Sequence, residues 1–394
     1  MKAREHGKPK TPPAFLTNIA LSIVDFLKKL QRKLIPPQTV LLNYAIGNIV
    51  INRSIYVAVE LGIADQLKDG PKSIAQLAGE TGGDADTLYR IMRTLTSEGI
   101  FKAKKNKHFE TNNLGRHLQT DLEDSMYTFI KATGSDWANG FWDNILETAR
   151  TGKDFYEKKY GMNFFDWLRN NSQAQRLFYE AMHGISATSD VPVVNAYDFS
   201  GFRTIADVGC GSGSQLLAIL RAYPEIDGIL FDLPSRVEAL ESEAGSRENK
   251  LNERLRYIPG DFFEFVPDGY DAYLMKSVLH DFDDEKAVEV LSNLSRAVPD
   301  DAILLIIENI LKEDNNEPDF SKVLDVNFMT MMGGRVRTKN EYSHLLEKSG
   351  FRLQRVIPTG TPFSILEARP VLARGINFST SRPAFVRDAG YAPG

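Results

Sequence analysis

The stretch TIADVGCGSGSQLLAIL, residues 204–220, places an apolar run, three glycines on alternate positions and a helix-like pattern in direct succession. Glycines at a strand-to-helix turn let backbone amides approach a ligand closely at the N-terminus of the helix. The spacing is G-x-G-x-G, and Ser214 stands where a dinucleotide fingerprint would have its third glycine. The loop with Gly209, Gly211 and Gly213 therefore predicts a nucleotide-derived cofactor, without identifying it.

Strand-like and helix-like segments alternate on both sides of this stretch, which is typical of a parallel, doubly wound sheet. The expected strands are 204–208, 228–232, 255–258, 272–276, 303–308, 351–356 and 364–367. The predicted fold class is therefore α/β, with a Rossmann-like doubly wound sheet in the C-terminal half of the chain.

Acidic residues at the strand ends narrow the choice of cofactor. Asp232 ends the second strand, where a carboxylate can accept both hydroxyls of a ribose. Asp207 precedes the first glycine, where it would repel a pyrophosphate but help to hold an ammonium group or cap the loop. Asp261 follows the third strand and either accepts from an adenine amino group or caps a turn, with Phe262 packing on the ring. Together these residues favour S-adenosylmethionine over NAD.

Composition excludes several classes of protein. Of 394 residues, 42% are hydrophobic and 25% charged, and the net charge of -5 argues against disorder and against a general nucleic-acid surface. The single cysteine, Cys210, permits no intrachain disulfide, and no metal-ligand pattern is evident. We find neither an apolar run of ~20 residues nor a secretory h-region. We therefore expect a cytoplasmic enzyme that acts on a small molecule.

The N-terminal part of the chain divides into two predicted units. Residues 1–45 form an extension with an amphipathic helix that packs on the body or on a second subunit, or lies on a membrane surface through its basic face. Residues 46–125 follow a winged-helix pattern, which serves DNA binding or dimerisation. The stretch DADTLYR puts acids at the start of the second helix, so we expect dimerisation and no nucleic-acid partner.

Three further segments complete the predicted organisation. Residues 126–200 are helical and rich in aromatic residues, and we expect them to link the two domains and to contribute to an apolar pocket. Residues 201–369 form the cofactor-binding sheet domain. Residues 370–394 are rich in Gly, Pro and Ser without periodicity, which predicts a flexible tail.

Six motifs give the chain a resemblance to a known family: DVGCGSG, FDLP, GDFF, YLMKSVLHDFDDE, IIENIL and GGRVRT. Over residues 45–369 it resembles the class I S-adenosylmethionine-dependent O-methyltransferases of the caffeate and hydroxyindole type, with their bacterial natural-product relatives. The resemblance implies a winged-helix domain that forms a homodimer. It also implies cofactor contacts at the following residues: Gly209, Asp232, Leu233, Asp261, Phe262 and Lys276.

The resemblance and the chemistry of methyl transfer together predict the reacting residues. His280 lies just after a strand, and the family resemblance assigns it the role of general base. Glu308 ends the next strand and would orient the imidazole, while Asp281 either assists or caps the helix near Asp283. Plant members carry a second glutamate where this chain has Val336. We therefore expect only Glu308 to raise the pKa of His280.

The predicted acceptor pocket is apolar. Flexible thioethers and aromatic rings suit a flat hydroxylated acceptor, although the same residues would suit core packing equally well. The candidates are Trp142, Phe178, Met182, Phe328, Met329 and Met332. The leading hypothesis is O-methylation of a small aromatic, polyketide or terpenoid metabolite. The alternatives are cofactor-dependent hydroxylation or decarboxylation, and a winged-helix regulator that responds to a ligand.

Overall fold

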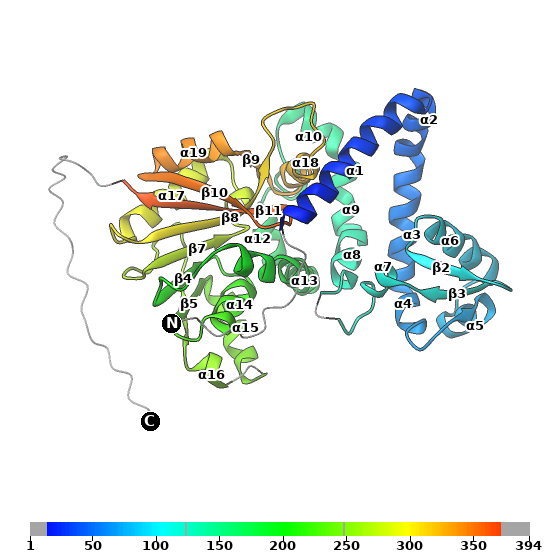
Figure 1. The fold of residues 1–394 in the computed structure, drawn as a ribbon, viewed down its shortest axis with the longest axis horizontal. Helices are drawn as coiled ribbons and strands as arrows, with labels where there is room; N and C mark the ends of the chain where they lie inside the picture. Colours follow the sequence, from blue (N-terminus) through cyan, green and yellow to red (C-terminus); the bar gives the residue numbers. More distant parts are fainter. Residues whose placement is uncertain (1–13, 123, 247–248, 372–394) are drawn as a thin grey trace.

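The computed structural model describes residues 14–122, 124–246 and 249–371. Figure 1 shows a mainly helical unit at one end of the long axis, the large sheet domain at the other, and helices α8–α13 between them. The predicted flexible tail lies almost wholly outside the described residues.

The winged-helix pattern is confirmed in the N-terminal unit. Ser73 and Gln76 form a capping box at the start of α5, and Asp84 caps α6 through the Thr87 amide. The apolar face of α6 is buried, so the helix packs inward while its acidic start faces solvent. The elements are α3 (Asn48–Glu60), α4 (Ile63–Gln66), β1 (Lys72–Ser73), α5 (Ile74–Thr81), α6 (Ala85–Ser97), β2 (Phe101–Lys104), β3 (His108–Thr111) and α7 (Asn113–Arg116).

The extension in front of this unit is helical, as predicted. Helix α1 (Ala14–Leu34) stops before Pro36, and α2 (Pro37–Leu42), η1 (Asn43–Gly47) and α3 follow one another without a break. The predicted boundary between residues 45 and 46 therefore falls inside η1. In Figure 1, α1 and α3 diverge from α2, and α1 reaches toward the sheet domain.

The connecting segment folds into short helices and one long one. These are α8 (Tyr127–Gly134), α9 (Asp136–Asp143), α10 (Ile145–Thr151), α11 (Phe155–Tyr160), α12 (Phe164–Arg169) and α13 (Ser172–Ala196). Aromatic side chains form their shared core, and Tyr156, at its centre, contacts several other rings. This arrangement confirms a helical segment, most of whose aromatic residues serve packing.

The large sheet has the strand order β10-β11-β8-β7-β4-β5-β6, and β9 pairs with the far end of β8. Its elements are β4 (Thr204–Val208), α14 (Ser214–Ala222), β5 (Asp227–Asp232), α15 (Pro234–Glu243), η2 (Ala244–Ser246), α16 (Asn249–Asn252), β6 (Leu255–Pro259), β7 (Ala272–Lys276), η3 (Leu279–Asp281), α17 (Asp284–Ala297), β8 (Ile303–Leu311), α18 (Phe320–Met332), β9 (Arg337–Thr338), α19 (Lys339–Lys348), β10 (Phe351–Pro358) and β11 (Phe363–Pro370).

The expectation of a fully parallel sheet was wrong at one edge. Strands β4 to β8 pair in parallel, but β11 is antiparallel to both β8 and β10. Only a four-residue turn separates β10 from β11, too short for the crossover that a parallel pair needs. The predicted α/β class and doubly wound core are nevertheless confirmed.

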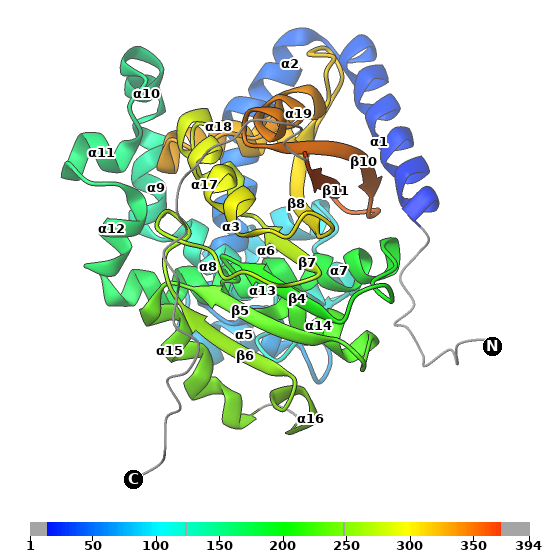
Figure 2. The same ribbon diagram turned by 90° about the vertical axis from the view of Figure 1, so that its left-hand side faces the viewer.

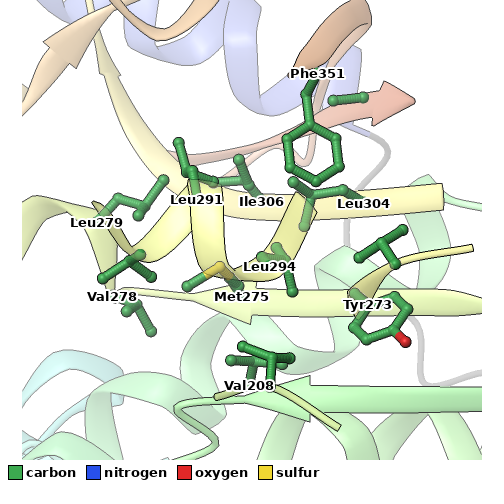
Figure 3. Close-up of a cluster of buried hydrophobic side chains, with 14 of the residues drawn as sticks. Val208, Tyr273, Met275, Val278, Leu279, Leu291, Leu294, Leu304, Ile306 and Phe351 are labelled. Carbon is green, nitrogen blue, oxygen red and sulfur yellow. The ribbon is translucent and has the colours of Figure 1, made fainter. Parts of the chain in front are cut away.

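Helices cover both faces of this sheet (Figures 1 and 2), so each strand must be apolar on both sides. Ala206 and Val208 point into the core under α17 and α19, whereas Ile205 points to the core under α13 and α14. Figure 3 shows the first core, where Leu291 and Leu294 of α17 lie over β7 and β8. This alternation decides which face receives each polar residue at the strand ends.

Candidate active site

The glycine loop adopts the conformation that its sequence predicts. Gly209, Gly211 and Gly213 all have positive φ, at 70°, 56° and 69°. A Cβ on Gly209 would lie 2.9 Å from the side chain of Val278, whereas one on Gly211 would meet nothing within 4 Å. The loop thus requires glycine for its backbone, and it leaves open space at Gly211.

Asp232 holds this loop at the end of β5. One carboxylate oxygen accepts from the Gly211 amide at 2.8 Å, and the other accepts from the Leu233 amide at 2.8 Å. Burial raises the pKa of Asp232, and these two amides oppose that rise. Each oxygen keeps a further acceptor position, so loop support and ribose binding are compatible.

The third strand end carries Asp261 and Phe262, as predicted. The Asp261 carboxylate accepts from the Phe263 amide at 2.9 Å, so it does cap a turn. The Phe262 ring is half-buried and lies close enough to Gly209 that a Cβ there would be 3.3 Å away. Phe262 therefore lies against the glycine loop at Gly209.

Asp207 and Lys276 lie beneath the loop, on the face of the sheet that α13 and α14 cover. Asp207 is only 2% exposed, and burial raises its pKa to about 8 although the Lys276 charge opposes the rise. Within the described residues, no hydrogen bond reaches its carboxyl group. A buried carboxyl without a donor is costly, so this group fits a ligand that brings a cationic donor.

The Lys276 ammonium is engaged by α13. It donates to Asp190 at 2.5 Å, to the Ser186 hydroxyl at 2.8 Å and to the Ser186 carbonyl at 3.2 Å. An ammonium has three donors, and all three are used here. The Lys276 ammonium therefore has no spare donor for the direct cofactor contact that the resemblance implied. Sequence reasoning missed Asp190, because its spacing along α13 gives no sign of a partner on β7.

The predicted base and its carboxylate come together after β7. The distance from Nδ1 of His280 to Oε2 of Glu308 is 2.6 Å, and Oε1 of Glu308 accepts from the amides of Val278, Leu279 and His280. Because Nδ1 faces a carboxylate, it carries the proton, and Nε2 remains as the basic atom. Glu308 was expected at a strand end, but β8 continues to Leu311 and pairs there with β9.

Asp281 is a second carboxyl group beside the predicted base, so the expectation that only Glu308 acts on His280 was wrong. Its Oδ1 lies 3.3 Å from Nε2 of His280, and the helix cap considered for it is provided by Asp283. Burial acts to lower the pKa of His280, but Glu308 and Asp281 outweigh it and raise that pKa to about 9. Burial raises the pKa of Asp281 itself to about 7, against the effect of His280.

The GGRVRT segment fixes the loop that carries the base. A Cβ on Gly334 would lie 2.2 Å from the His280 carbonyl, and the Arg335 amide donates to that carbonyl at 2.8 Å. Arg337 is fully buried and donates to the carbonyls of Leu279 and Phe282 on either side. Val336 is buried, with its amide bonded to Asp325. Arg337 had no assigned role in the sequence analysis, although its motif had been singled out.

The pocket candidates divide into two groups. The Phe328 ring stacks on the His280 imidazole with centroids 4.2 Å apart, and Phe178, Phe328 and Met332 share one apolar cluster. Trp142, Met182 and Met329 are more than a third exposed and lie outside that cluster. Phe328 is therefore the candidate that lies against the base.

These residues fit S-adenosylmethionine. The glycine loop opens at Gly211, Asp232 keeps free acceptor positions, and the unbonded Asp207 carboxyl can receive a cation. Among the described residues, no group of His, Cys, Asp and Glu side chains is arranged to hold a metal ion, and no helix is long and apolar enough to span a bilayer.

Comparisons with known proteins agree with this geometry. Residues 142–352 match the O-methyltransferase domain family, and residues 42–121 match the O-methyltransferase dimerisation domain. The chain is 40% identical over 339 residues to phenazine O-methyltransferase PhzM of Lysobacter antibioticus, covering 86% of this chain and 97% of that protein.

Solved structures show the same architecture. The crystal structure of LaPhzM aligns with a TM-score of 0.79 at 38% identity, covering 86% of this chain and all of that one. The neocarzinostatin-biosynthesis O-methyltransferase NcsB1, solved with S-adenosylmethionine and 2-hydroxy-5-methyl naphthoic acid, aligns with a TM-score of 0.67 at 25% identity, covering 82% and 96%. The chain thus belongs to the S-adenosylmethionine-dependent O-methyltransferase family and carries that family's dimerisation domain.

Proposed function

We propose that this enzyme methylates a hydroxyl group of a flat, fused-ring aromatic metabolite, with His280 as general base. The observation that carries the proposal is the His280–Glu308 pair, in which Nδ1 faces the carboxylate and the imidazole ring stacks on Phe328. Relatives named for phenazine and hydroxynaphthoate acceptors support the ring class.

The chain's own residues provide binding, orientation and proton transfer. When bound, S-adenosylmethionine supplies an electrophilic methyl group. Asp232 and the glycine loop would hold its nucleoside part, and Asp207 its ammonium end. Phe328 would orient the acceptor ring so that its hydroxyl faces Nε2 of His280. The proton moves from that hydroxyl to Nε2, and Glu308 and Asp281 stabilise the imidazolium.

The base favours oxygen as the methyl acceptor. A hydroxyl must lose its proton as the methyl group is transferred, whereas a neutral amine attacks through its lone pair and loses a proton only afterwards. A buried imidazole between two carboxylates serves the first reaction directly.

The test is an acceptor screen with methyl-labelled S-adenosylmethionine, read by product mass. Hydroxyphenazines and hydroxynaphthoates should gain one labelled methyl group, and the carbon NMR shift of that labelled methyl group should identify it as bonded to oxygen and not to nitrogen. Matched amino-substituted rings form the control. Methylation of the amines alone would contradict the assignment to oxygen.

We further propose a homodimer that extends beyond the dimerisation domain into α1. Helix α1 turns its apolar residues to solvent, with Phe26 63% and Leu34 73% exposed, while Asp25 and Lys29 pair with Lys312 and Glu317 of the sheet domain. Exposed apolar residues continue into α2, η1 and the start of α3. A second copy is the partner that the dimerisation domain supports.

Light scattering tests this assembly. The intact chain should give twice its 44.2 kDa mass, and Phe26→Asp with Leu30→Asp should raise the dimer dissociation constant. Glu289→Lys, at an exposed site on α17 outside the dimerisation domain, is the control. If the double variant leaves the dimer unchanged but abolishes binding to anionic vesicles, α1 is a membrane-surface helix.

A further inference from the structure

The Lys276 ammonium is a buried cation that has more than one carboxylate neighbour at the cofactor end of the sheet. Two carboxylates, those of Asp190 and Asp207, act on this single ammonium beneath the glycine loop, and Asp232 acts in turn on Asp207. Arg236 also lies close, but its Nε donates to the Gly211 carbonyl. The ammonium can therefore pair with one of its two carboxylate neighbours, and it hydrogen-bonds to Asp190.

Asp190 is the selected partner, and the pair is well buried. The side chains of Lys276 and Asp190 are 7% and 8% exposed. Ser186, one helical turn before Asp190, takes the two remaining donors and also contacts the hydroxyl of Ser214 at 3.0 Å. Helix α13 thus provides a complete set of acceptors for the ammonium.

Asp207 is the competing partner. It lies on β4, next to β7, in register with Leu274, so Lys276 is two residues further along the neighbouring strand. Because side chains alternate along a strand, Lys276 shares the face of Leu274 and Asp207. A flexible lysine side chain released from α13 can reach Asp207 from there.

We infer that Asp190 is a positioning residue that retains the Lys276 ammonium on α13, so that the Asp207 carboxyl group stays free to ionise against the cationic end of the cofactor. This inference rests on the proposed function. It also gives Lys276 an indirect role in cofactor binding, in place of the direct contact that the resemblance implied.

A buried charge without a counter-charge is costly. Without Asp190, a buried ammonium would lack its anion and would pair with the nearest remaining carboxylate. Asp207 would then be neutralised by a protein cation, and the ammonium of the cofactor would lose its acceptor. The sulfonium of S-adenosylmethionine would also lose a favourable field, whereas S-adenosylhomocysteine has no sulfonium to be affected.

The experiment compares Asp190→Asn with the double variant Asp190→Asn/Lys276→Met by calorimetry. Asp190→Asn should lower the affinity for S-adenosylmethionine by about tenfold or more, because the lost interaction is charge-assisted. The affinity for S-adenosylhomocysteine should fall by less. The double variant should recover affinity to within about threefold, because no lysine remains to occupy Asp207. Glu180→Gln, at an exposed site on α13, is the matched control.

Several results would overturn the inference. If Asp190→Asn binds both nucleosides like the control, Asp190 has no such role. If the double variant binds no better than Asp190→Asn, Lys276 contacts the cofactor itself. Equal losses for the two nucleosides indicate a merely structural pair. Should Asp190→Asn fail to fold, Ser186→Ala, which removes one acceptor, should show the same preferential loss at smaller size, and no loss would refute the inference.

Failure of the proposed function would look different. If the wild-type protein binds neither nucleoside, or transfers no methyl group to a hydroxyl, the proposed function fails. If the wild type binds and transfers normally while Asp190→Asn matches Glu180→Gln, only the present inference fails.

Discussion

Two buried ion pairs lie at the end of β7, and they differ in what remains free. Lys276 gives all its donors to α13, so nothing of its ammonium is left for a ligand. His280 gives Nδ1 to Glu308, and its Nε2, 3.3 Å from Asp281, is the atom proposed as the base. We infer that the fixed cation serves as a neutralised neighbour of the cofactor site, whereas the titratable cation serves because it can lose its proton.

The largest effect should come from the base itself. His280→Ala should lower kcat by about 10²- to 10⁴-fold, the usual cost of removing a general base, and should change cofactor affinity little. Single-turnover methyl transfer measures the first quantity and calorimetry the second. His344→Ala, at an exposed site on α19, is the control. Near-normal turnover would mean that the enzyme acts by positioning alone.

Variants of the cofactor site should weaken nucleoside binding more than they lower the rate of methyl transfer. Asp232→Ala should weaken S-adenosylhomocysteine on the order of 10- to 100-fold, because charge-assisted hydrogen bonds contribute ~1.5–3 kcal/mol each. Part of this loss reflects the freed amides of Gly211 and Leu233. Calorimetry compares it with Asp227→Ala, an exposed residue at the start of β5. Unchanged binding would refute the role assigned to Asp232.

The pH dependence separates the two pairs. Because the carboxylates raise the pKa of His280 to about 9, kcat/KM should increase with pH until His280 has lost its proton near that value. Glu308→Gln removes a negative charge, so the rise should move to lower pH by a unit or more, with a lower plateau. Asp190→Asn, in the other pair, should leave the midpoint of the rise in place. A shared shift would mean that the two pairs are not independent.

Asp281 should produce the smallest change. Its oxygen is 3.3 Å from Nε2, compared with 2.6 Å between Glu308 and Nδ1, so Asp281→Asn should shift the same rise to lower pH by less than Glu308→Gln does. Asp300→Asn, at a distant exposed turn, is the control for the profile. A shift in the opposite direction would show that Asp281 does not stabilise the imidazolium.

Local sequence was sufficient to predict much of the secondary structure and the conformation of the glycine loop. The alternating glycines require positive φ, Ser73 with Gln76 and Asp84 fix two helix starts, and apolar runs locate the strands. These features depend on residues within a few positions of one another, so the sequence by itself determined them. His280 and Glu308 were predicted from the family resemblance, and the parallel pairing of β7 with β8 brings them together across 28 positions.

Tertiary structure decided the features that join distant segments. The antiparallel edge depends on the pairing of β11 with β8, and the partner of Lys276 lies 86 positions away on a helix without a distinctive pattern. Arg337 donates to the Leu279 carbonyl, 58 positions away, and the turn of η3 brings the Asp281 carboxyl group to Nε2 of His280. Opposite charges from distant segments come close only when the chain folds, and their spacing along the sequence does not indicate that they will pair.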